Sequence, residues 1–286
     1  NNCLIENCEV HHNGNPSVET NDQGMFLSYV TNSTIKNNKV HHNTGAGEGC
    51  QDGGNGIFFY GGGYNVVTEN IVYDNKKAGI FTKMKSKHNN ISYNKVVGNG
   101  QGGIVLRCKL SSFFIIEHNT VMDNKGPGIY VGGSNNTLKY NTVVNNRNGS
   151  IYTGDASIAN GIRISREADN IILISNNVTG NDDVDIYVKE GLTGVSGYNN
   201  TYQTSFNYED DTRSEAWGRK TIRGKKMVSL KNRGENRKEK LESGFMASAG
   251  APLIATLMVL IVLAFIGYGY LRGEEKQKSR RKWIRT

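Results

Sequence analysis

The sequence predicts an all-β fold: a single-stranded, right-handed parallel β-helix followed by a stalk and one transmembrane helix. Three observations lead to this prediction. A short motif recurs seven times over the first two thirds of the chain, and short runs of alternating apolar and variable residues follow its copies, as in half-buried strands. Near the C-terminus, 28 consecutive residues carry no charge.

The repeated motif reads aliphatic, two variable positions, Asn, one variable position, Val, two variable positions, Asn. Its copies begin at Ile5, Ile35, Val67, Ile91, Ile116, Leu138 and Leu173, and the first copy has Cys8 in the first Asn place. The second Asn recurs in steps of 30, 32, 24, 25, 22 and 35 residues. A repeat of this length without a helical period predicts a β-solenoid, because stacked turns share an apolar interior that no single turn can bury alone.

Each motif ends in a turn, which usually leads to Gly and a second short strand. These glycines are Gly24, Gly56, Gly79, Gly103, Gly128 and Gly161, and the last copy has Asp185 instead. We expect Asn at the corners for two reasons: it tolerates left-handed backbone, and its amide can bond to the next turn. A leucine-rich repeat has a similar length, but its Leu framework is missing.

These repeats resemble those of the pectate-lyase-like superfamily and, within it, the short repeats shared with NosD-type periplasmic proteins. The resemblance covers roughly residues 1–200 and implies a right-handed parallel β-helix of about seven rungs over 1–204. The superfamily's hydrolases carry an Asn-Thr-Asp and a paired-Asp signature. Here Asp182 and Asp183 form such a pair, but no Asn-Thr-Asp accompanies them, and the Asp-Pro-His motif of the alginate epimerases is absent. No enzyme subfamily is therefore implied.

Three insertions leave the coil at the same corner, at residues 14–23, 44–55 and 147–160. We expect them to wall a trough whose floor is rungs three to five. An outward-facing row would carry the predicted substrate-binding residues Phe58, Phe81, Tyr130 and Arg163, since exposed rings suit a sugar face and cations suit an acidic sugar. The alternative is an ordinary β-rich outer face.

Four residues are candidates for catalysis: Asp74, Asp123, Lys83 and Arg107. Lys83 and Arg107 fall on adjacent rungs and provide a base and positive charge for a uronate lyase, although Arg is a poor base. Asp74 and Asp123 hold equivalent places two rungs apart, roughly 9–10 Å, near the upper limit for an inverting glycosidase. The alternative for both Asp residues is turn chemistry.

The sequence His-His-Asn occurs twice, so that His12 and His42 are predicted to stack on neighbouring rungs with Asp74 next in the column. Stacked imidazoles beside a carboxylate suit copper or zinc. The alternative is a turn variant with solvated imidazoles. Calcium or copper is the cofactor we expect, if one is bound. The four cysteines, Cys3, Cys8, Cys50 and Cys108, fit either disulfides or free thiols and match no zinc template.

The net charge of +8 lies outside the repeats. Residues 1–204 contain 16 Lys/Arg and 17 Asp/Glu, whereas residues 205–286 contain 18 and 9. A nucleic-acid-binding protein should carry its basic face on the folded domain, so we expect no nucleic-acid partner. Membrane lipid and an envelope polymer are the expected partners.

After the repeats, residues 205–243 are polar and rich in Lys, Arg and Glu, which predicts a stalk without a core. Residues 244–271 contain no charge and exceed the ~20 residues that a transmembrane helix needs. Residues 272–286 form a basic tail. Lys/Arg counts on the two sides of the span do not fix its orientation. We expect a single-pass protein with an extracellular or periplasmic β-helix, because exported β-helices are the norm in the resembled superfamily. The chain begins at Asn1, so we interpret it as a fragment or a processed product.

Three functions fit these features. The first is a cell-surface protein that binds polysaccharide or another envelope component. The second is a polysaccharide lyase, hydrolase or epimerase acting on an acidic glycan, and the third is a NosD-like metal-handling protein. Whether the chain is an enzyme is left open by its sequence.

Overall fold

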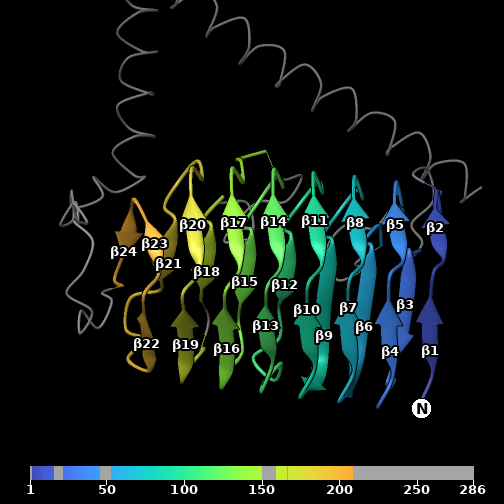
Figure 1. Ribbon diagram of the computed structural model, residues 1–286, viewed down its shortest axis with the longest axis horizontal. Coiled ribbons are helices and arrows are strands. Elements are labelled where there is room, and N and C mark those ends of the chain that lie inside the picture. Colours follow the sequence, from blue (N-terminus) through green and yellow to red (C-terminus); the bar gives the residue numbers. More distant parts are fainter. Residues whose placement is uncertain (1, 16–21, 46–52, 150–158, 166, 209–286) are drawn as a thin grey trace, which may run out of the picture. The chain divides into compact units, whose positions relative to one another are not determined.

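The described part of the chain forms a parallel β-helix with three faces. The computed structural model describes residues 2–15, 22–45, 53–149, 159–165 and 167–208, and within these ranges it contains strands and no helix. The strands form three parallel sheets of eight, which we call A, B and C. The chain passes through A, B and C once per turn, and we call each turn a rung (Figure 1). This architecture confirms the predicted all-β solenoid.

Sheet A contains β1 (Leu4–Glu6), β4 (Thr34–Lys36), β7 (Val66–Thr68), β10 (Asn90–Ser92), β13 (Ile115–Glu117), β16 (Asn136–Lys139), β19 (Ile171–Ile174) and β22 (Val195–Tyr198). Sheet B contains β2 (Glu9–His11), β5 (Lys39–His41), β8 (Ile71–Tyr73), β11 (Lys95–Val97), β14 (Thr120–Met122), β17 (Thr142–Val144), β20 (Asn177–Thr179) and β23 (Thr201–Tyr202). Sheet C contains β3 (Met25–Ser28), β6 (Ile57–Gly63), β9 (Ile80–Lys87), β12 (Ile104–Leu106), β15 (Ile129–Val131), β18 (Ile162–Ile164), β21 (Ile186–Val188) and β24 (Ser205–Phe206).

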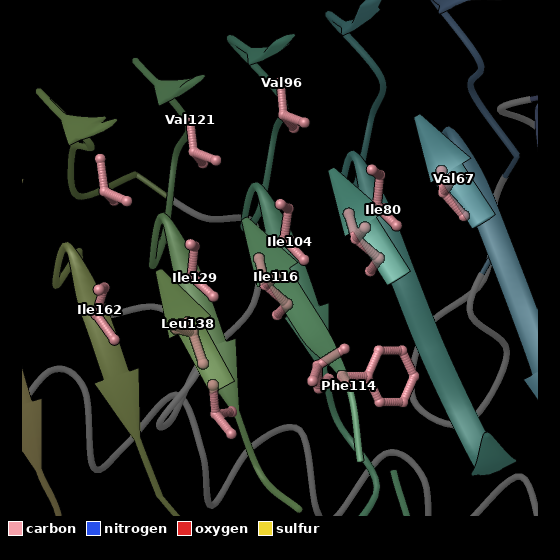
Figure 2. Packing of buried hydrophobic residues seen from close by; sticks show 14 of the residues in the cluster. Val67, Ile80, Val96, Ile104, Phe114, Ile116, Val121, Ile129, Leu138 and Ile162 are labelled. Atoms are coloured by element: carbon pink, nitrogen blue, oxygen red, sulfur yellow. The ribbon is translucent and has the colours of Figure 1, made fainter. Parts of the chain in front are cut away.

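The interior consists of aliphatic columns that run along the helix axis. Every motif places its first residue inside sheet A and its Val inside sheet B, and register pairing aligns Ile91 with Ile116 and Val96 with Val121. Ile104 and Ile129 do the same in sheet C. Figure 2 shows these columns meeting between the sheets. Because such side chains are fully buried, each stabilises the fold by about 1.5–3 kcal/mol.

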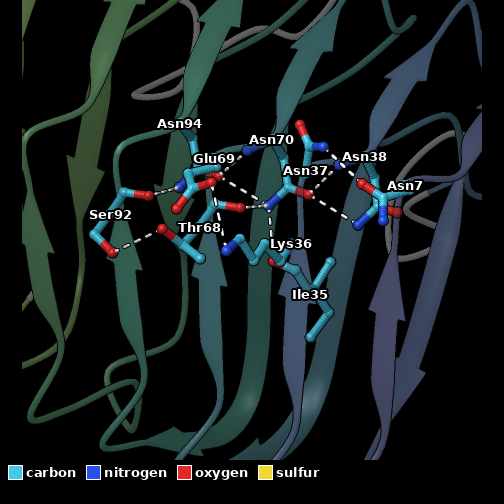
Figure 3. Close-up of polar contacts among 10 residues, drawn as sticks. All are labelled: Asn7, Ile35, Lys36, Asn37, Asn38, Thr68, Glu69, Asn70, Ser92 and Asn94. Atoms are coloured by element: carbon cyan, nitrogen blue, oxygen red, sulfur yellow. Dashed lines mark hydrogen bonds and ion pairs between the residues drawn. The ribbon is translucent and has the colours of Figure 1, made fainter.

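Buried asparagines form two ladders at the corners of sheet B. The first Asn ladder lies at the corner between sheets A and B and comprises Asn38, Asn70, Asn94, Asn119, Asn141, Asn176 and Asn200. In each step, the backbone N–H and the side-chain Nδ2 of one Asn donate to Oδ1 of the next, as Asn38, Asn70 and Asn94 do in Figure 3. Nδ2 also donates to a backbone carbonyl: Nδ2 of Asn70, for example, donates to the carbonyl of Ile35. The inter-rung amide bonds that the sequence predicts are therefore confirmed.

The second Asn ladder lies at the corner between sheets B and C and comprises Asn13, Asn43, Asn75, Asn99, Asn124, Asn146 and Asn181. It ends on Asp185, whose Oδ1 accepts the Nδ2–H of Asn181 at 3.0 Å. The other carboxylate oxygen of Asp185 accepts the backbone N–H groups of Gln203 and Thr204. Asp185, which stands in place of the recurrent Gly, thus supplies the acceptor that an Asn of the next rung provides elsewhere in the ladder.

The left-handed residue at these corners is not the ladder Asn. It is the residue immediately before it, at φ values such as 58° for Glu69, 56° for Tyr93 and 54° for His118. The expectation that Asn serves the corner by adopting left-handed backbone is therefore wrong. Its amide geometry explains its recurrence, and the preceding position takes the strain with Asn, Asp, His, Tyr, Ser, Glu or Gly.

The recurrent Gly at the start of sheet C is required by close packing. A Cβ on Gly103 would lie 2.6 Å from the backbone oxygen of Gly128 and would also collide with Cγ1 of Val121. Gly56, Gly79, Gly128 and Gly161 have equivalent surroundings. Sheet C therefore approaches the second Asn ladder closely on the rungs that carry this Gly.

The seven motifs correspond to seven rungs, and β22, β23 and β24 add an eighth. The last strand, Ser205–Phe206, extends just past residue 204, the predicted end of the β-helix. Tyr208 is buried in the core cluster and its hydroxyl accepts the Nδ2–H of Asn200 at 2.9 Å, so it closes the end of the first Asn ladder.

Residues 209–286 lie outside the described residues, and with them most of the predicted stalk, the predicted span at 244–271 and the tail. The centres of the three insertions, 16–21, 46–52 and 150–158, also lie outside them. In the part that is described, no helix has the length and hydrophobicity to cross a membrane.

Candidate functional site

The predicted catalytic residues fall on two different faces of the β-helix. Asp74 and Asp123 follow β8 and β14 at the left-handed corner position, with φ values of 49° and 56°. Lys83 lies in β9, and Arg107 follows β12 on the adjacent rung, where its N–H donates to the carbonyl of Thr82. The carboxylates thus line the corner between sheets B and C, whereas the cations lie at the far end of sheet C. The structure does not bring the two pairs into one site.

Asp74 occupies the space above Gly98, which separates the two carboxylates in their column. Its Oδ1 is 2.7 Å from where a Cβ of Gly98 would be. The Gly therefore makes room for the Asp74 side chain on the next rung. Left-handed backbone and this local packing both agree with the turn interpretation, and a catalytic role for Asp74 and Asp123 stays a prediction.

The predicted sugar-binding row is in register but is not exposed. Phe58, Phe81, Tyr130 and Arg163 align across β6, β9, β15 and β18, with Val105 of β12 between them. All four are at most 4% exposed. The prediction of an exposed row is therefore wrong for these side chains.

The chemistry of the row explains its burial. Phe58 and Phe81 pack edge to face, with ring centroids 5.2 Å apart, and Ala78 and Val105 complete an apolar cluster outside sheet C. The Arg163 guanidinium donates to Asn160 Oδ1 at 2.8 Å and lies 4.3 Å from the centroid of the Tyr187 ring. Large side chains that lie directly opposite each other on adjacent rungs cover one another, which strand alternation alone does not reveal.

Exposed aromatic rings flank sheet A, where the sequence predicts no site. Three stacked rings, Tyr64, His88 and Phe113, precede β7, β10 and β13, and we call them the Tyr64 ladder. Three more, Tyr93, His118 and Tyr140, follow β10, β13 and β16, and we call them the Tyr93 ladder. Centroid spacings of 4.7–4.9 Å match the rung spacing.

Both ring ladders stand on the left-handed corner positions that flank sheet A. Tyr64 is 62% exposed and Tyr93 is 58% exposed, and each terminal ring has one stacked ring neighbour among the described residues. An aromatic residue before a corner Asn, as in Tyr93-Asn94, His118-Asn119 and Tyr140-Asn141, is the sequence signal that would have located them.

Between the ring ladders, the outer face of sheet A presents polar, aliphatic and paired charged side chains: Val66, Thr68, Asn90, Ile115, Glu117, Thr137 and Lys139. The cations on this face are paired. Lys36 Nζ lies 3.7 Å from Glu69 Oε2 (Figure 3), and Lys139 Nζ lies 2.9 Å from Glu117 Oε2. The face therefore offers hydrogen bonds and apolar contact without a strong net charge.

The Glu117–Lys139 pair is the shorter and the less exposed of the two. Burial of the Glu117 carboxylate opposes ionisation, but hydrogen bonds from Lys139 and Asn90 outweigh it, so the pKa of Glu117 lies below its ordinary value. The hydrogen bond to Glu117 raises the pKa of Lys139 above its ordinary value. The two charges hold β13 and β16 in register on the surface.

The predicted metal residues His12 and His42 do stack, with ring centroids 5.2 Å apart and an angle of 9° between the planes. His11 and His41 stack beside them, 5.1 Å apart, and Tyr73 continues that column. Among the described residues, no three His, Cys, Asp or Glu side chains converge on a common metal position. Copper and calcium binding stay predictions.

Of the cysteines, Cys8 and Cys108 form no disulfide within the described ranges, and Cys50 lies outside them. Cys8 is exposed, donates its thiol to the carbonyl of Glu6 at 3.3 Å, and starts the first Asn ladder through its backbone N–H, which bonds to Asn38. The thiol alternative therefore fits these two residues.

Comparison with known proteins agrees with the fold described above. The model of the family named "Right handed beta helix region" matches residues 1–134 and 48–164, which together span more than half of the chain. The chain therefore belongs to the right-handed β-helix family.

Individual relatives share less. The Probable ABC transporter binding protein NosD of Stutzerimonas stutzeri is 31% identical over 103 residues, which is 34% of this chain and 23% of NosD. The chain thus matches less than a quarter of that protein's length. The Dettilon tailspike protein superposes with a TM-score of 0.55 at 18% identity, over 70% of this chain and 45% of the tailspike. The A-module of mannuronan C-5 epimerase AlgE6 from Azotobacter vinelandii gives 0.50 at 18% identity, over 71% and 50%. These two likenesses concern the fold.

Proposed function

We propose that this chain is a membrane-anchored cell-surface protein whose β-helix binds a polysaccharide along the outer face of sheet A. The observation that carries the proposal is the pair of exposed ring ladders on the two sides of that face. They replace the buried row on sheet C as the place where a glycan would lie.

Exposed rings on left-handed corners do not favour folding, so their presence supports a role in binding. A Tyr or Phe at positive φ is sterically strained, and the fold gains little from a ring that is about half exposed. Contiguous exposed apolar surface with a polar surround commonly marks a binding site. The free faces of the terminal rings suit the apolar faces of sugars, and the hydroxyls of Thr68 and Thr137 suit sugar hydroxyls.

Charge favours a neutral polymer over an acidic one on this face. Both Lys36 and Lys139 are engaged by carboxylates, so an acidic sugar would have to displace Glu69 or Glu117. The mannuronan epimerase module shows that the same fold serves a protein named for a polysaccharide substrate. It supports the class of partner rather than its charge.

The anchor rests on the uncharged segment 244–271, and the basic residues on both sides of it suit anionic lipid headgroups. We propose that the β-helix faces the extracellular or periplasmic side. Protease protection of the chain in sealed vesicles of known orientation would test this placement. Digestion of the β-helix from the outside supports it, and protection contradicts it.

The function is tested by electrophoresis of the full chain, kept in solution with a mild detergent, through gels that contain a panel of neutral and acidic polysaccharides. We expect retardation by at least one neutral polymer, with no new reducing ends or unsaturated products. Cleavage lost in Asp74→Ala or Lys83→Ala would instead establish an enzyme at the predicted catalytic residues. Neither retardation nor cleavage would contradict both.

A further inference from the structure

The histidines of the first two rungs form two pairs, and each pair lies within one rung. Nδ1 of His11 and Nδ1 of His12 are 2.7 Å apart, and Nδ1 of His41 and Nδ1 of His42 are 2.8 Å apart. In both pairs the rings are nearly perpendicular. The same local geometry thus recurs on successive rungs.

Ring orientation decides which histidines can share a ligand. Rings stacked across rungs, such as His12 and His42, are parallel and about 5 Å apart, so their nitrogens point side by side and cannot reach one ion through bonds of about 2.0–2.1 Å. Rings within a rung converge on their Nδ1 atoms. The chelating unit is therefore the two neighbouring histidines of one rung, and not the column of His12 and His42 that the sequence predicted.

The separation of the Nδ1 atoms is close to what a shared ion needs. Two bonds of about 2.0–2.1 Å at a right angle place the donor atoms about 2.9 Å apart, and a tetrahedral angle needs about 3.3 Å. The 2.7 and 2.8 Å separations belong to hydrogen-bonded, metal-free pairs, so they place the donors close together without fixing the bond angle at the ion. Imidazole nitrogens suit Cu(II) and Ni(II), and the affinity of divalent ions for such donors rises through Ni(II) to a maximum at Cu(II).

A carboxylate orients the second pair. Nε2–H of His41 donates to Glu9 Oε1 at 3.2 Å, which leaves Nδ1 of His41 with its lone pair toward His42. In the metal-free pair, His42 donates its Nδ1–H to that lone pair. To become a ligand, His42 shifts to the tautomer protonated on Nε2, and both rings turn so that their Nδ1 lone pairs face the ion instead of each other.

We propose that His11/His12 and His41/His42 are two chelating sites for Cu(II) or Ni(II), stacked one rung apart, with the tighter site at His41/His42. That site has Glu9 against it and Asp74 next in the corner column. Since no third protein ligand converges on either pair among the described residues, water completes each coordination sphere. Two divalent ions about 5 Å apart repel each other, so the second ion binds at least about ten-fold more weakly than the first.

The test is a calorimetric titration of the untagged full chain in detergent with Ni(II), which does not oxidise the thiols. We expect about two ions per chain in two steps. His42→Gln should remove the tighter step and His12→Gln the weaker one. His88→Gln and His118→Gln replace single histidines stacked between other rings, and both steps of Ni(II) binding should be unchanged in them. Circular dichroism identifies any variant that fails to fold.

A second measurement does not depend on affinity. Electron paramagnetic resonance of the chain loaded with Cu(II) should show the half-field signal of two coupled ions about one rung apart, and both His12→Gln and His42→Gln should abolish it. Unchanged stoichiometry in both variants would overturn the proposal. A loss confined to one variant would overturn the site at the other pair.

Discussion

Two adjacent columns at the corner after sheet A contrast sharply. The first Asn ladder repeats one residue type on seven consecutive rungs, and each Asn is buried. The column one residue earlier is left-handed and mostly exposed, and there the chain places Asn, Glu, Tyr, His, Tyr, Ser and Asn in turn. The ladder position is Asn on every one of these rungs, whereas the position one residue earlier accommodates several residue types.

Hydrogen bonding explains the constraint on the buried column. Asn119 accepts the N–H and Nδ2–H of Asn94, and it donates its own to Asn141 and to two backbone carbonyls. Only a short amide both accepts and donates in this geometry. His118, one residue away, stacks between Tyr93 and Tyr140 at the surface and has no comparable obligation. Variation at the exposed column is therefore where function can be encoded.

The largest expected effect comes from breaking the buried column. Asn119→Ala leaves the buried backbone N–H of Asn94 without its acceptor, removes one of the acceptors of Asn94 Nδ2 and removes the Nδ2–H that Asn119 donates to the carbonyl of Ile91. A buried group left unpaired costs about 1–3 kcal/mol, and the lost bonds add to it. We expect the free energy of unfolding to fall by about 3 kcal/mol or more in urea denaturation. His118→Ala is the matched control and should cost less than about 1 kcal/mol. Equal losses in the two variants would contradict the distinction between the columns.

Close packing behind the second Asn ladder should give the next largest effect. Gly103→Ala places a methyl group against the backbone of Gly128, which cannot retract without shifting a whole rung. We expect a loss of about 1–3 kcal/mol, measured as a lower urea midpoint with an unchanged slope. A variant as stable as the parent chain would show that the rungs separate more easily than the packing implies.

A change in the exposed column should affect binding and leave stability nearly unaltered. We expect Tyr93→Ser to weaken polysaccharide binding about five- to ten-fold, about 1–1.4 kcal/mol, because it removes a terminal ring of the Tyr93 ladder. Tyr29→Ser is the control, since Tyr29 is 59% exposed but belongs to neither ring ladder. Affinity gel electrophoresis measures both, and an equal effect of the two substitutions would argue against sheet A.

The smallest expected effect concerns pH. The pKa of Glu117 is lower in the folded chain than its ordinary 4.5, so its contribution to stability is complete above that value and is lost as pH falls through the lowered one. Glu117→Gln should therefore reduce stability at neutral pH by about 0.5–1 kcal/mol and flatten the decline below pH ~4.5. Denaturation curves between pH 2 and 7 measure the difference. Parallel curves for the two proteins would contradict a native-state ion pair.

The repeat was sufficient to predict the fold because it is set by short-range chemistry. Each motif copy forms one rung, and the corner Asn residues of consecutive copies are the residues whose side-chain amides bond to each other. The role of the Asn was only half predicted. Its amide bonds were expected, but the left-handed backbone belongs to the residue before it, because backbone dihedrals are not visible in a repeat pattern.

The candidate site was harder to predict for a physical reason. Alternation correctly placed Phe58 and Phe81 on the outer face of sheet C, yet outward does not mean exposed when neighbouring rungs carry large rings. The exposed rings occur at corners, outside the alternating strands, and so the period-two pattern passes over them. Likewise, the stacking of His12 and His42 was predicted correctly. Their Nδ1 atoms, however, face His11 and His41 of the same rung and not each other.

Hydroxyl-radical footprinting of the full chain, with and without a polysaccharide that retards it, tests the central claim most directly. The account predicts that the bound polymer protects Tyr64, Tyr93, Phe113 and Tyr140 from oxidation and leaves Tyr29 as reactive as before. Protection confined to residues outside sheet A, with these four rings unchanged, would contradict a glycan-binding face between the two ring ladders.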